Sequence, residues 1–327
     1  MRSGKLVNLL EEEVEMLRGQ DFYCPACEGE VKLKAGPVVR AYFAHVTLAD
    51  CAQVWAENES AQHLGLKAAL YRWFQKSREG MLVEVERYLP ELSQTPDLLV
   101  NGRLAIEIQC SRLSVARLRE RTRTYRKHGY AVLWLLGRDL WLDKRLTPLL
   151  REMLYFSENA GFYLWELDLA RGELRLKSLI HEHLRGTIAC MVRSVKFDSV
   201  DLMTVLRSPY AAQPLTRLPV KSDKDFQAYL TQQLHYQNPR WMKIQENYYR
   251  AGENLLTVDL TGLQWTPVGL NPLSVKFDGL PEGQFLQIPM SVRSYYQDFL
   301  RYNQTATTAV YPPAFYRDYF ANEKSKL

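Results

Sequence analysis

The stretch TPDLLVNGRLAIEIQCS, residues 95–111, decides the fold of this chain. Its two short apolar runs flank an Asn-Gly pair, which is among the strongest sequence signals for a β-hairpin. Both runs carry polar side chains, because Asp97 opens the first and Glu107 and Gln109 lie in the second. A carboxylate on a strand of the core is costly unless it is paired or binds a cation. The hairpin is therefore the first candidate for a functional site.

The length of the hairpin loop decides whether the two acids share a face. Side chains alternate between the faces of a strand, so Glu107 and Gln109 project to the same side. A two-residue loop pairs Asp97 with Ile106 and sends Glu107 to the opposite face. A three-residue loop, with Gly102 as the left-handed residue, brings Asp97 and Glu107 to one side. A shared metal site therefore requires an odd-length loop or a bulge.

Two carboxylates on one face suit Mg²⁺ or Mn²⁺, which take oxygen ligands and keep several waters. A cation held by Asp97 and Glu107 lowers the pKa of a bound water and stabilises charge on a phosphodiester. We expect a further carboxylate from Glu59 in the preceding helix, or from Glu84 or Glu86 in the strand MLVEVERYL. We expect Gln109 to orient the attacking water. The alternative is structural: Asp97 begins a strand, and Glu107 pairs with an arginine of the following helix.

The composition is that of an ordinary globular protein. Of the 327 residues, 46% are hydrophobic and 24% are charged, which argues against wholesale disorder and suggests two or three domains. The net charge of +5 is too small to indicate nucleic-acid binding by itself. No apolar run approaches the length of a membrane span, and the first residues lack the long apolar core of a signal peptide. We therefore expect a cytoplasmic protein without a membrane span.

Residues 57–138 alternate between helical and strand patterns. The order is helix, strand, hairpin, helix and strand, which predicts a small mixed sheet flanked by helices. The second helix is expected to end at Gly129, and the apolar run AVLWLLG after it is typical of a strand that is covered on both faces.

The rest of the chain has two segments that differ in sequence pattern and composition. Residues 146–156 have a helical pattern, and residues 161–179 predict a strand pair. Beyond about residue 208 the sequence is rich in Tyr, Gln and Asn, with several prolines, which is typical of helices separated by irregular loops.

The cysteines indicate metal binding rather than disulfides, because five cysteines in a chain of this length fit no disulfide framework. Cys24 and Cys27 form a C-x-x-C motif, and His45 and Cys51 follow. Together they make a Cys₃His set, which Zn²⁺ binds tetrahedrally. A redox pair is a second interpretation, but the sequence after Cys27 lacks the strand–helix context of a thioredoxin-like site. A third is a metal site that has been lost.

The helix after the hairpin is strongly basic. Residues 112–127 hold six arginines and one lysine against a single glutamate. Arg117, Arg121 and Tyr125 lie at intervals of four, so they share a face. Guanidinium groups suit phosphate oxygens, and a tyrosine ring can stack on a base, which predicts contact with DNA. The alternative is a solvated basic face that pairs with nearby acids such as Glu84 and Glu86.

The helix before the hairpin has a polar face of its own. Glu59, His63 and Lys67 also lie at intervals of four. We expect His63 and Lys67 to contact DNA phosphates, or His63 to touch a metal; the alternative for His63 is a histidine that makes one surface hydrogen bond.

Several motifs in order along the chain resemble known families. Pro96-Asp97 followed by Glu107-Ile108-Gln109, on a hairpin between helices, resembles the core of the PD-(D/E)xK nuclease superfamily. More specifically, the chain resembles the CoiA family of competence proteins from naturally transformable bacteria. The motifs that carry this resemblance are YCPAC, YFAH, ENESAQHLGLKAALYRWF, PDLLVNGRLAIEIQCS, YAVLWLLG, FYLWELD, ENLLT, FLQI and YPPAFYRDYF.

The resemblance implies an α+β or α/β protein in three parts. These are a zinc-ribbon-like region (1–56), a PD-(D/E)xK-like domain with a mixed sheet flanked by helices (57–150), and a mainly helical C-terminal domain (151–327). It also implies a role after DNA uptake, in processing or recombining incoming single-stranded DNA alongside the recombinase RecA and other competence proteins.

The chain departs from the family patterns at two positions. The superfamily usually carries lysine where this chain has Gln109, and the lysine stabilises the nucleophile and the scissile phosphate. Many family members have histidine at the position of Tyr42, so only His45 of that motif remains as a ligand.

Two main functions follow from this reading. The first is a Mg²⁺- or Mn²⁺-dependent deoxyribonuclease, in which Asp97 and Glu107 hold the metal, Gln109 positions the water and Glu59 assists. The alternative is a non-catalytic DNA-binding or recombinase-assisting factor with a degenerate nuclease fold. A protein-interaction scaffold is the third hypothesis.

Overall fold

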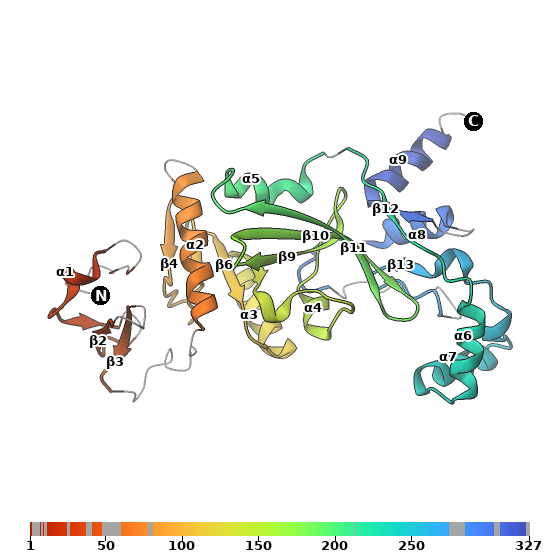
Figure 1. Ribbon diagram of the computed structural model, residues 1–327, viewed down its shortest axis with the longest axis horizontal. Coiled ribbons are helices and arrows are strands. Elements are labelled where there is room, and N and C mark those ends of the chain that lie inside the picture. Colours follow the sequence, from red (N-terminus) through yellow and green to blue (C-terminus); the bar gives the residue numbers. More distant parts are fainter. Residues whose placement is uncertain are drawn as a thin grey trace.

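The structure is a computed structural model of the chain (Figure 1). It describes residues 1, 7, 9, 12–24, 27–36, 41–47, 60–77, 81–212, 214–274, 285–303 and 308–324.

The N-terminal region is a small antiparallel sheet. After the short helix α1 (Val14–Leu17), the strands β1 (Phe22–Tyr23), β2 (Glu30–Lys34) and β3 (Tyr42–His45) pair in the order β1-β2-β3. Its buried cluster among the described residues consists of Leu17, Phe22, Cys24 and Val31. A core of this size contributes little stability, so a region of this kind usually depends on a metal or another cross-link.

The central sheet has nine strands in the described part of the chain. Seven form the order β11-β10-β9-β7-β6-β5-β4, while β8 pairs with β9 and β13 with β10. The strands are β4 (Val83–Val85), β5 (Leu98–Val100), β6 (Leu104–Gln109), β7 (Ala131–Leu136), β8 (Tyr155–Ser157), β9 (Gly161–Asp168), β10 (Glu173–His183), β11 (Ile188–Lys196) and β13 (Trp265–Pro267). The pairs β6–β7 and β7–β9 are parallel and the others antiparallel. The expectation of a mixed sheet flanked by helices is confirmed.

Helix α2 (Ala61–Ser77) covers one face of the sheet. Leu66 and Leu70 of α2 pack in one buried cluster with Ile106 and Ile108 of β6, and α5 (Leu202–Arg207) adds to the same cluster. The spacing of the two leucines follows the helix period, and that of the isoleucines follows the strand period. The side chains between the isoleucines must therefore face the other way.

Helix α3 (Val115–Lys127) lies on that other face. Its Leu118 and Tyr125 pack in a second cluster with Ala105 of β6. The helix begins at Ser114, whose hydroxyl accepts the Arg117 amide, and it ends before Gly129 at φ +81°. The predicted end of this helix is confirmed, because glycine is favoured in that left-handed conformation.

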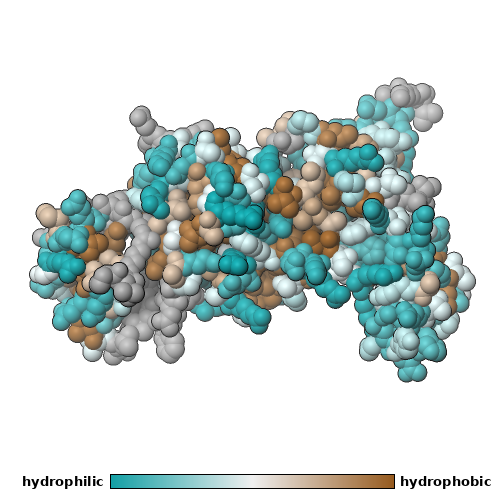
Figure 2. Space-filling model, viewed as in Figure 1, coloured by the Kyte–Doolittle hydropathy of each residue, from teal (hydrophilic) through white to brown (hydrophobic). Residues whose placement is uncertain are grey.

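The remaining helices and short elements belong to the second half of the chain, apart from η1 and α4. They are η1 (Arg138–Leu140), α4 (Pro148–Glu152), η2 (Ser208–Tyr210), β12 (Leu218–Pro219), α6 (Phe226–His235), α7 (Pro239–Arg250), η3 (Leu255–Thr257), η4 (Thr261–Leu263), α8 (Arg293–Tyr302), β14 (Ala309–Val310) and α9 (Pro313–Lys324). In the view of Figure 2, the region of α6 and α7 at the lower right is largely hydrophilic. No described helix combines the length and the apolar character that crossing a membrane requires.

The sheet does not stop at residue 150, where the sequence led us to expect a domain boundary. The predicted strand pair is confirmed as β9 and β10, and β9 pairs in parallel with β7. The segment expected to be mainly helical therefore begins with sheet strands, and helices predominate only after β11. In addition, α8 and α9 contribute Tyr295 and Tyr316 to the cluster that α3 covers, so this core draws on both sides of the expected boundary.

The helix expected over residues 146–156 is shorter than predicted. It is limited to α4, and the chain then continues into β8, which is fully buried and pairs with β9. A short apolar run such as Tyr155–Ser157 fits a buried strand and a buried helix equally well, so periodicity alone could not locate the change.

Candidate functional site

The hairpin between β5 and β6 has the odd-length loop that a shared site requires. Leu98 pairs with Ile106 and Val100 with Leu104, which leaves residues 101–103 as the loop. Continuing this register by one step places Asp97 opposite Glu107, and residues opposite each other project to the same face. Of the two loop lengths that the sequence left open, the structure has the three-residue one, with Gly102 at φ +63°.

Asp97 immediately precedes β5, opposite the part of β6 that extends beyond its pairing with β5. The residue as a whole is nearly buried, at 8% exposure, and its Oδ2 accepts the Ile108 amide at 2.7 Å. Its Oδ1 lies 2.9 Å from His63 Nε2 and 3.4 Å from Lys67 Nζ, and both of these residues come from α2. Burial alone raises the pKa of Asp97, but the hydrogen bond from His63 and the charge of Lys67 outweigh it and lower that pKa below its ordinary value.

Glu107 is buried beside Asp97 and is held from α3. The Arg121 guanidinium and the Tyr125 hydroxyl both donate to Glu107 Oε1, each at 2.6 Å. Burial raises the pKa of Glu107 to about 7, because desolvation and the nearby Asp97 charge outweigh the opposing effect of Arg121. Both hydrogen bonds use the same oxygen, so Oε2 is the atom that a further partner can approach.

Gln109 is also buried, on the strand face that it shares with Glu107. Its side-chain amide donates to the Ser111 carbonyl at 2.9 Å. The amide group of Gln109 therefore lies on the same strand face as Glu107, and it is uncharged.

The two faces of the basic helix α3 differ. Arg117 is exposed, whereas Arg121 is half-buried, with its guanidinium 5.6 Å from the centre of the Trp134 ring. Tyr125 is 0% exposed and packs in the core. A ring in that position cannot stack on a base, so the predicted DNA contact of Tyr125 is wrong and its hydroxyl instead fixes Glu107. The spacing of four residues put Tyr125 on the face of Arg121 but did not reveal that this face turns inward.

The acids around the site form ion pairs that the sequence did not indicate. Arg119 of α3 pairs with Glu152 of α4, at 2.5 Å. Glu84 pairs with Arg87 at 2.8 Å, and Glu86 pairs with Lys67. Glu84 and Glu86 therefore do not neutralise the basic helix, which was the structural alternative for its charges. Glu59, the expected assisting carboxylate, lies outside the described residues.

A second buried charge group lies on the same sheet and had no signal in the sequence reading. Glu166 of β9 is 0% exposed, and burial raises its pKa. Arg175 of β10 lies 3.4 Å from it and stacks over the Trp141 ring at 3.6 Å. The predicted strand pair included Glu166, but the sequence did not show that its neighbours would cover it.

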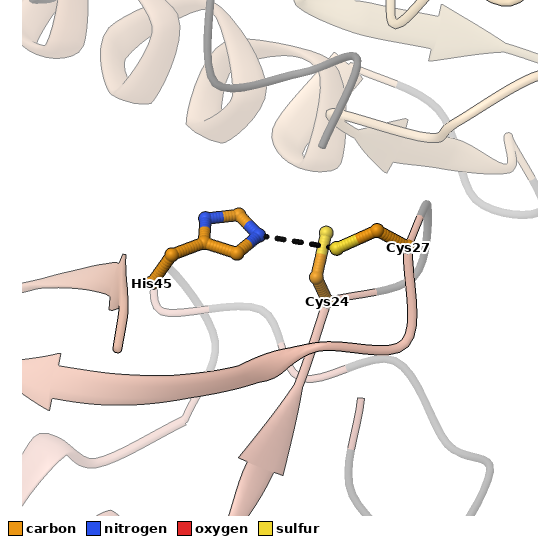
Figure 3. A group of neighbouring side chains, drawn as sticks. All are labelled: Cys24, Cys27 and His45. Atoms are coloured by element: carbon orange, nitrogen blue, oxygen red, sulfur yellow. Dashed lines mark hydrogen bonds between the residues drawn. The ribbon is translucent and has the colours of Figure 1, made fainter. Parts of the chain in front are cut away.

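The N-terminal region brings together a set of metal-ligand atoms. The sulfur atoms of Cys24 and Cys27 and a ring nitrogen of His45 lie within 4.8 Å of one another, and Figure 3 shows the His45 ring pointing at the two cysteines. The Cys27 sulfur is 3.4 Å from His45 Nε2. A Cβ atom at Gly29 would come within 3.3 Å of the Cys27 sulfur, so the turn is closely fitted. The fourth expected ligand, Cys51, lies outside the described residues.

Comparisons with known proteins agree on one family. The description "Competence protein CoiA, nuclease-like domain" matches residues 59–209, and "Competence protein CoiA, N-terminal domain" matches residues 6–53. The chain is also similar to the Competence protein CoiA of Bacillus subtilis (strain 168), with 31% identity over 129 residues, which is 38% of this chain. The similar part spans only 34% of that relative's length. No solved structure matches significantly.

The two family matches follow the chain order and together cover more than half of the chain. The first includes the acid pair, and the second includes the two cysteines and the histidine of the metal-ligand set. The chain belongs to the CoiA family of competence proteins and contains its nuclease-like domain.

Proposed function

We propose that the protein acts in natural transformation and cleaves incoming single-stranded DNA with Mg²⁺ or Mn²⁺ held by Asp97 and Glu107. The observation that carries the proposal is the β5–β6 register, which sets the two buried carboxylates on one face. Burying two like charges together is unfavourable, and a divalent cation removes that cost. The nuclease-like family domain supports DNA as the substrate.

The side chains around the acids have separate roles in this proposal. The bound metal supplies a water of lowered pKa and neutralises charge on the phosphodiester. Gln109 orients the water but cannot take its proton, because an amide does not titrate in the useful range. The exposed Arg117 and the half-buried Arg121 bind phosphates of the strand, and Glu59 assists the metal. We place this reaction in the cytoplasm, before RecA and other competence proteins act on the strand.

Cleavage of a labelled single-stranded oligonucleotide tests the proposal. We expect cleavage by the unchanged protein with Mn²⁺, and loss of at least about a hundredfold in rate for Glu107→Ala. Glu84→Gln is the matched control, because it removes one acid whose ion pair, among the described residues, is with the exposed Arg87. Equal cleavage by all three proteins, or none by the unchanged protein, contradicts the proposal.

A non-catalytic DNA-binding factor is the second candidate. The observation that favours it is the pairing of Glu107 with Arg121 and Tyr125, which neutralises this carboxylate without a metal. The uncharged Gln109 also favours this candidate, because it supplies no charge to stabilise a nucleophile or a phosphate. Transformation yield separates the two candidates: a strain carrying Glu107→Gln transforms poorly if the acid holds a catalytic metal, and normally if the protein only binds DNA.

We also propose that Cys24, Cys27, His45 and Cys51 bind a structural Zn²⁺. Two sulfurs and an imidazole nitrogen in close proximity are the donor set that zinc prefers, and thiolates gathered without a cation would repel one another. Metal analysis of the purified chain should find one zinc per molecule and none in Cys24→Ser. Cys190→Ser, which removes a thiol far from this set in sequence, should keep the zinc.

A further inference from the structure

Lys67 is a buried cation at the edge of the acid pair. Its side chain is 3% exposed, and its ammonium group lies between two carboxylates, Asp97 at 3.4 Å and Glu86 in direct contact. The position is specific to Lys67, because Lys76 on the same helix is 64% exposed and pairs with Asp198. Burying an ammonium group is costly unless anions compensate it, so any rearrangement here must leave Lys67 next to an anion.

The two carboxylates described next to Lys67 differ in their access to water. The Asp97 side chain is 11% exposed, whereas that of Glu86 is 53% exposed. Glu86 also adopts φ +50°, in the left-handed region that side-chain-bearing residues disfavour. Its amide donates to the Asp97 carbonyl at 3.2 Å. The end of β4 is therefore held in a strained conformation that brings a half-exposed carboxylate onto Lys67.

We propose that Lys67 is a phosphate-binding residue and that Glu86 occupies it until a phosphate of the DNA strand takes its place. The inference rests on the proposed DNA substrate and adds the subsite that binds one of its phosphates. Exchange of one anion for another keeps Lys67 compensated. The displaced Glu86 side chain returns to water at little cost, because half of it is already there. Asp97 remains on the buried side of Lys67 throughout.

The exchange predicts an unusual effect of removing Glu86. Fluorescence anisotropy of a labelled single-stranded oligonucleotide, with the zinc-loaded full chain in buffer that lacks Mg²⁺ and Mn²⁺, measures binding without cleavage. Glu86→Gln should bind the strand about fivefold more tightly, since the phosphate no longer competes for Lys67. Glu84→Gln, which makes the same change in net charge two residues away, should change the affinity less than about twofold.

A double variant tests whether the gain passes through Lys67. Lys67→Met should weaken binding, and adding Glu86→Gln to it should restore nothing. A gain from Glu86→Gln that persists without Lys67, or that Glu84→Gln reproduces, overturns the inference. Should Lys67→Met fail to fold, as its thermal melt would show, the comparison of Glu86→Gln with Glu84→Gln decides alone.

The same proteins separate this inference from the proposed nuclease function. A Lys67-dependent gain in affinity from Glu86→Gln, together with no Mn²⁺-dependent cleavage, supports the phosphate subsite and contradicts the nuclease function. Normal cleavage with no such gain in affinity supports the nuclease function and contradicts the phosphate subsite.

Discussion

Glu107 is subject to opposing effects on its pKa. Burial and Asp97 disfavour its charge, while Arg121 and Tyr125 stabilise it through one carboxylate oxygen. The pKa of about 7 that results means that the group is partly protonated near neutral pH. A divalent cation or the Arg121 guanidinium can stabilise the charged form, and the second is present in the fold itself.

Tyr125→Phe should destabilise the protein by about 2 kcal/mol. The change leaves the buried ring in place but removes a hydroxyl that donates to a carboxylate, and hydrogen bonds to charged groups are the stronger kind. Urea unfolding measures the effect. Tyr130→Phe is the control, because its hydroxyl donates to Glu91 at the surface and its loss should cost under about 0.5 kcal/mol. Equal costs for both variants would refute the assigned role of Tyr125.

His181 should make the protein sensitive to mild acid. Its side chain is buried, and desolvation lowers its pKa to about 4 from 6.5. Its Nδ1 bonds to the Leu179 carbonyl, and its Nε2 to the Tyr295 hydroxyl, an arrangement that fits the neutral ring with the proton on Nδ1.

The direction in which stability changes with pH depends on which state, folded or unfolded, binds the proton of His181. As the pH falls below 6.5 the unfolded chain protonates this histidine and the folded chain does not, so stability is lost until the pH reaches about 4. At pH 5 the loss is about 2 kcal/mol relative to pH 8. His181→Gln should remove this part of the pH dependence in urea unfolding, whereas His128→Gln, at an exposed position, should keep it. An unchanged pH profile in His181→Gln would contradict the account.

The β5–β6 hairpin is the element that aligns the acids, and its loop contains Gly102 in the left-handed region. A Cβ atom there would meet nothing within 4 Å, so any cost of a side chain arises from the backbone alone. Gly102→Ala should therefore destabilise the domain by about 1 kcal/mol. Arg103→Ala in the same loop should have an effect within about 0.5 kcal/mol in the same urea experiment. A Gly102→Ala variant of unchanged stability would mean that the loop is not under this constraint.

The elements with strong local signals were the ones that the sequence predicted well. The Asn-Gly pair predicted the hairpin, and residues 161–179 predicted the strand pair of β9 and β10, because turn chemistry and strand pairing here are local. The parity of the loop remained open, since a two-residue and a three-residue connection use the same Asn-Gly pair. The β7–β9 pairing could not be predicted, because it joins segments whose contact is decided by tertiary packing.

The candidate site was predicted in its composition more than in its contacts. The sequence selected Asp97, Glu107, His63 and Lys67. The structure brings His63 and Lys67 to Asp97, and Glu107 lies close enough to Asp97 for its charge to raise the Glu107 pKa. The ion pair of Lys67 with Glu86 depends on a left-handed residue at the end of β4, which no residue type announces, since glutamate disfavours that conformation.

The whole molecule combines a broad sheet with a small N-terminal region of very different core size. Helices cover both faces of the sheet with large buried clusters, whereas the buried cluster described in the N-terminal region is small. The two parts should therefore differ in how they depend on metal.

Removal of zinc should unfold the N-terminal region selectively. Calorimetry of the full chain with a chelator should show loss of one small transition while the main transition stays within about 2 °C, because the large clusters contain none of the three described zinc ligands. Cys27→Ser should give the same trace without chelator. A chelator that shifts the main transition strongly, or none at all, would contradict a structural zinc confined to this region.

Binding of Mn²⁺ by the acid pair is the most direct test of the central claim, that Asp97 and Glu107 converge to hold a divalent cation. Electron paramagnetic resonance of free Mn²⁺ in the presence of the zinc-loaded full chain measures this binding without any need for cleavage. We predict one Mn²⁺ site that is lost in both Asp97→Asn and Glu107→Gln and is kept in Glu84→Gln. A protein that binds no Mn²⁺, or that binds it equally well after either of the first two substitutions, would contradict the account.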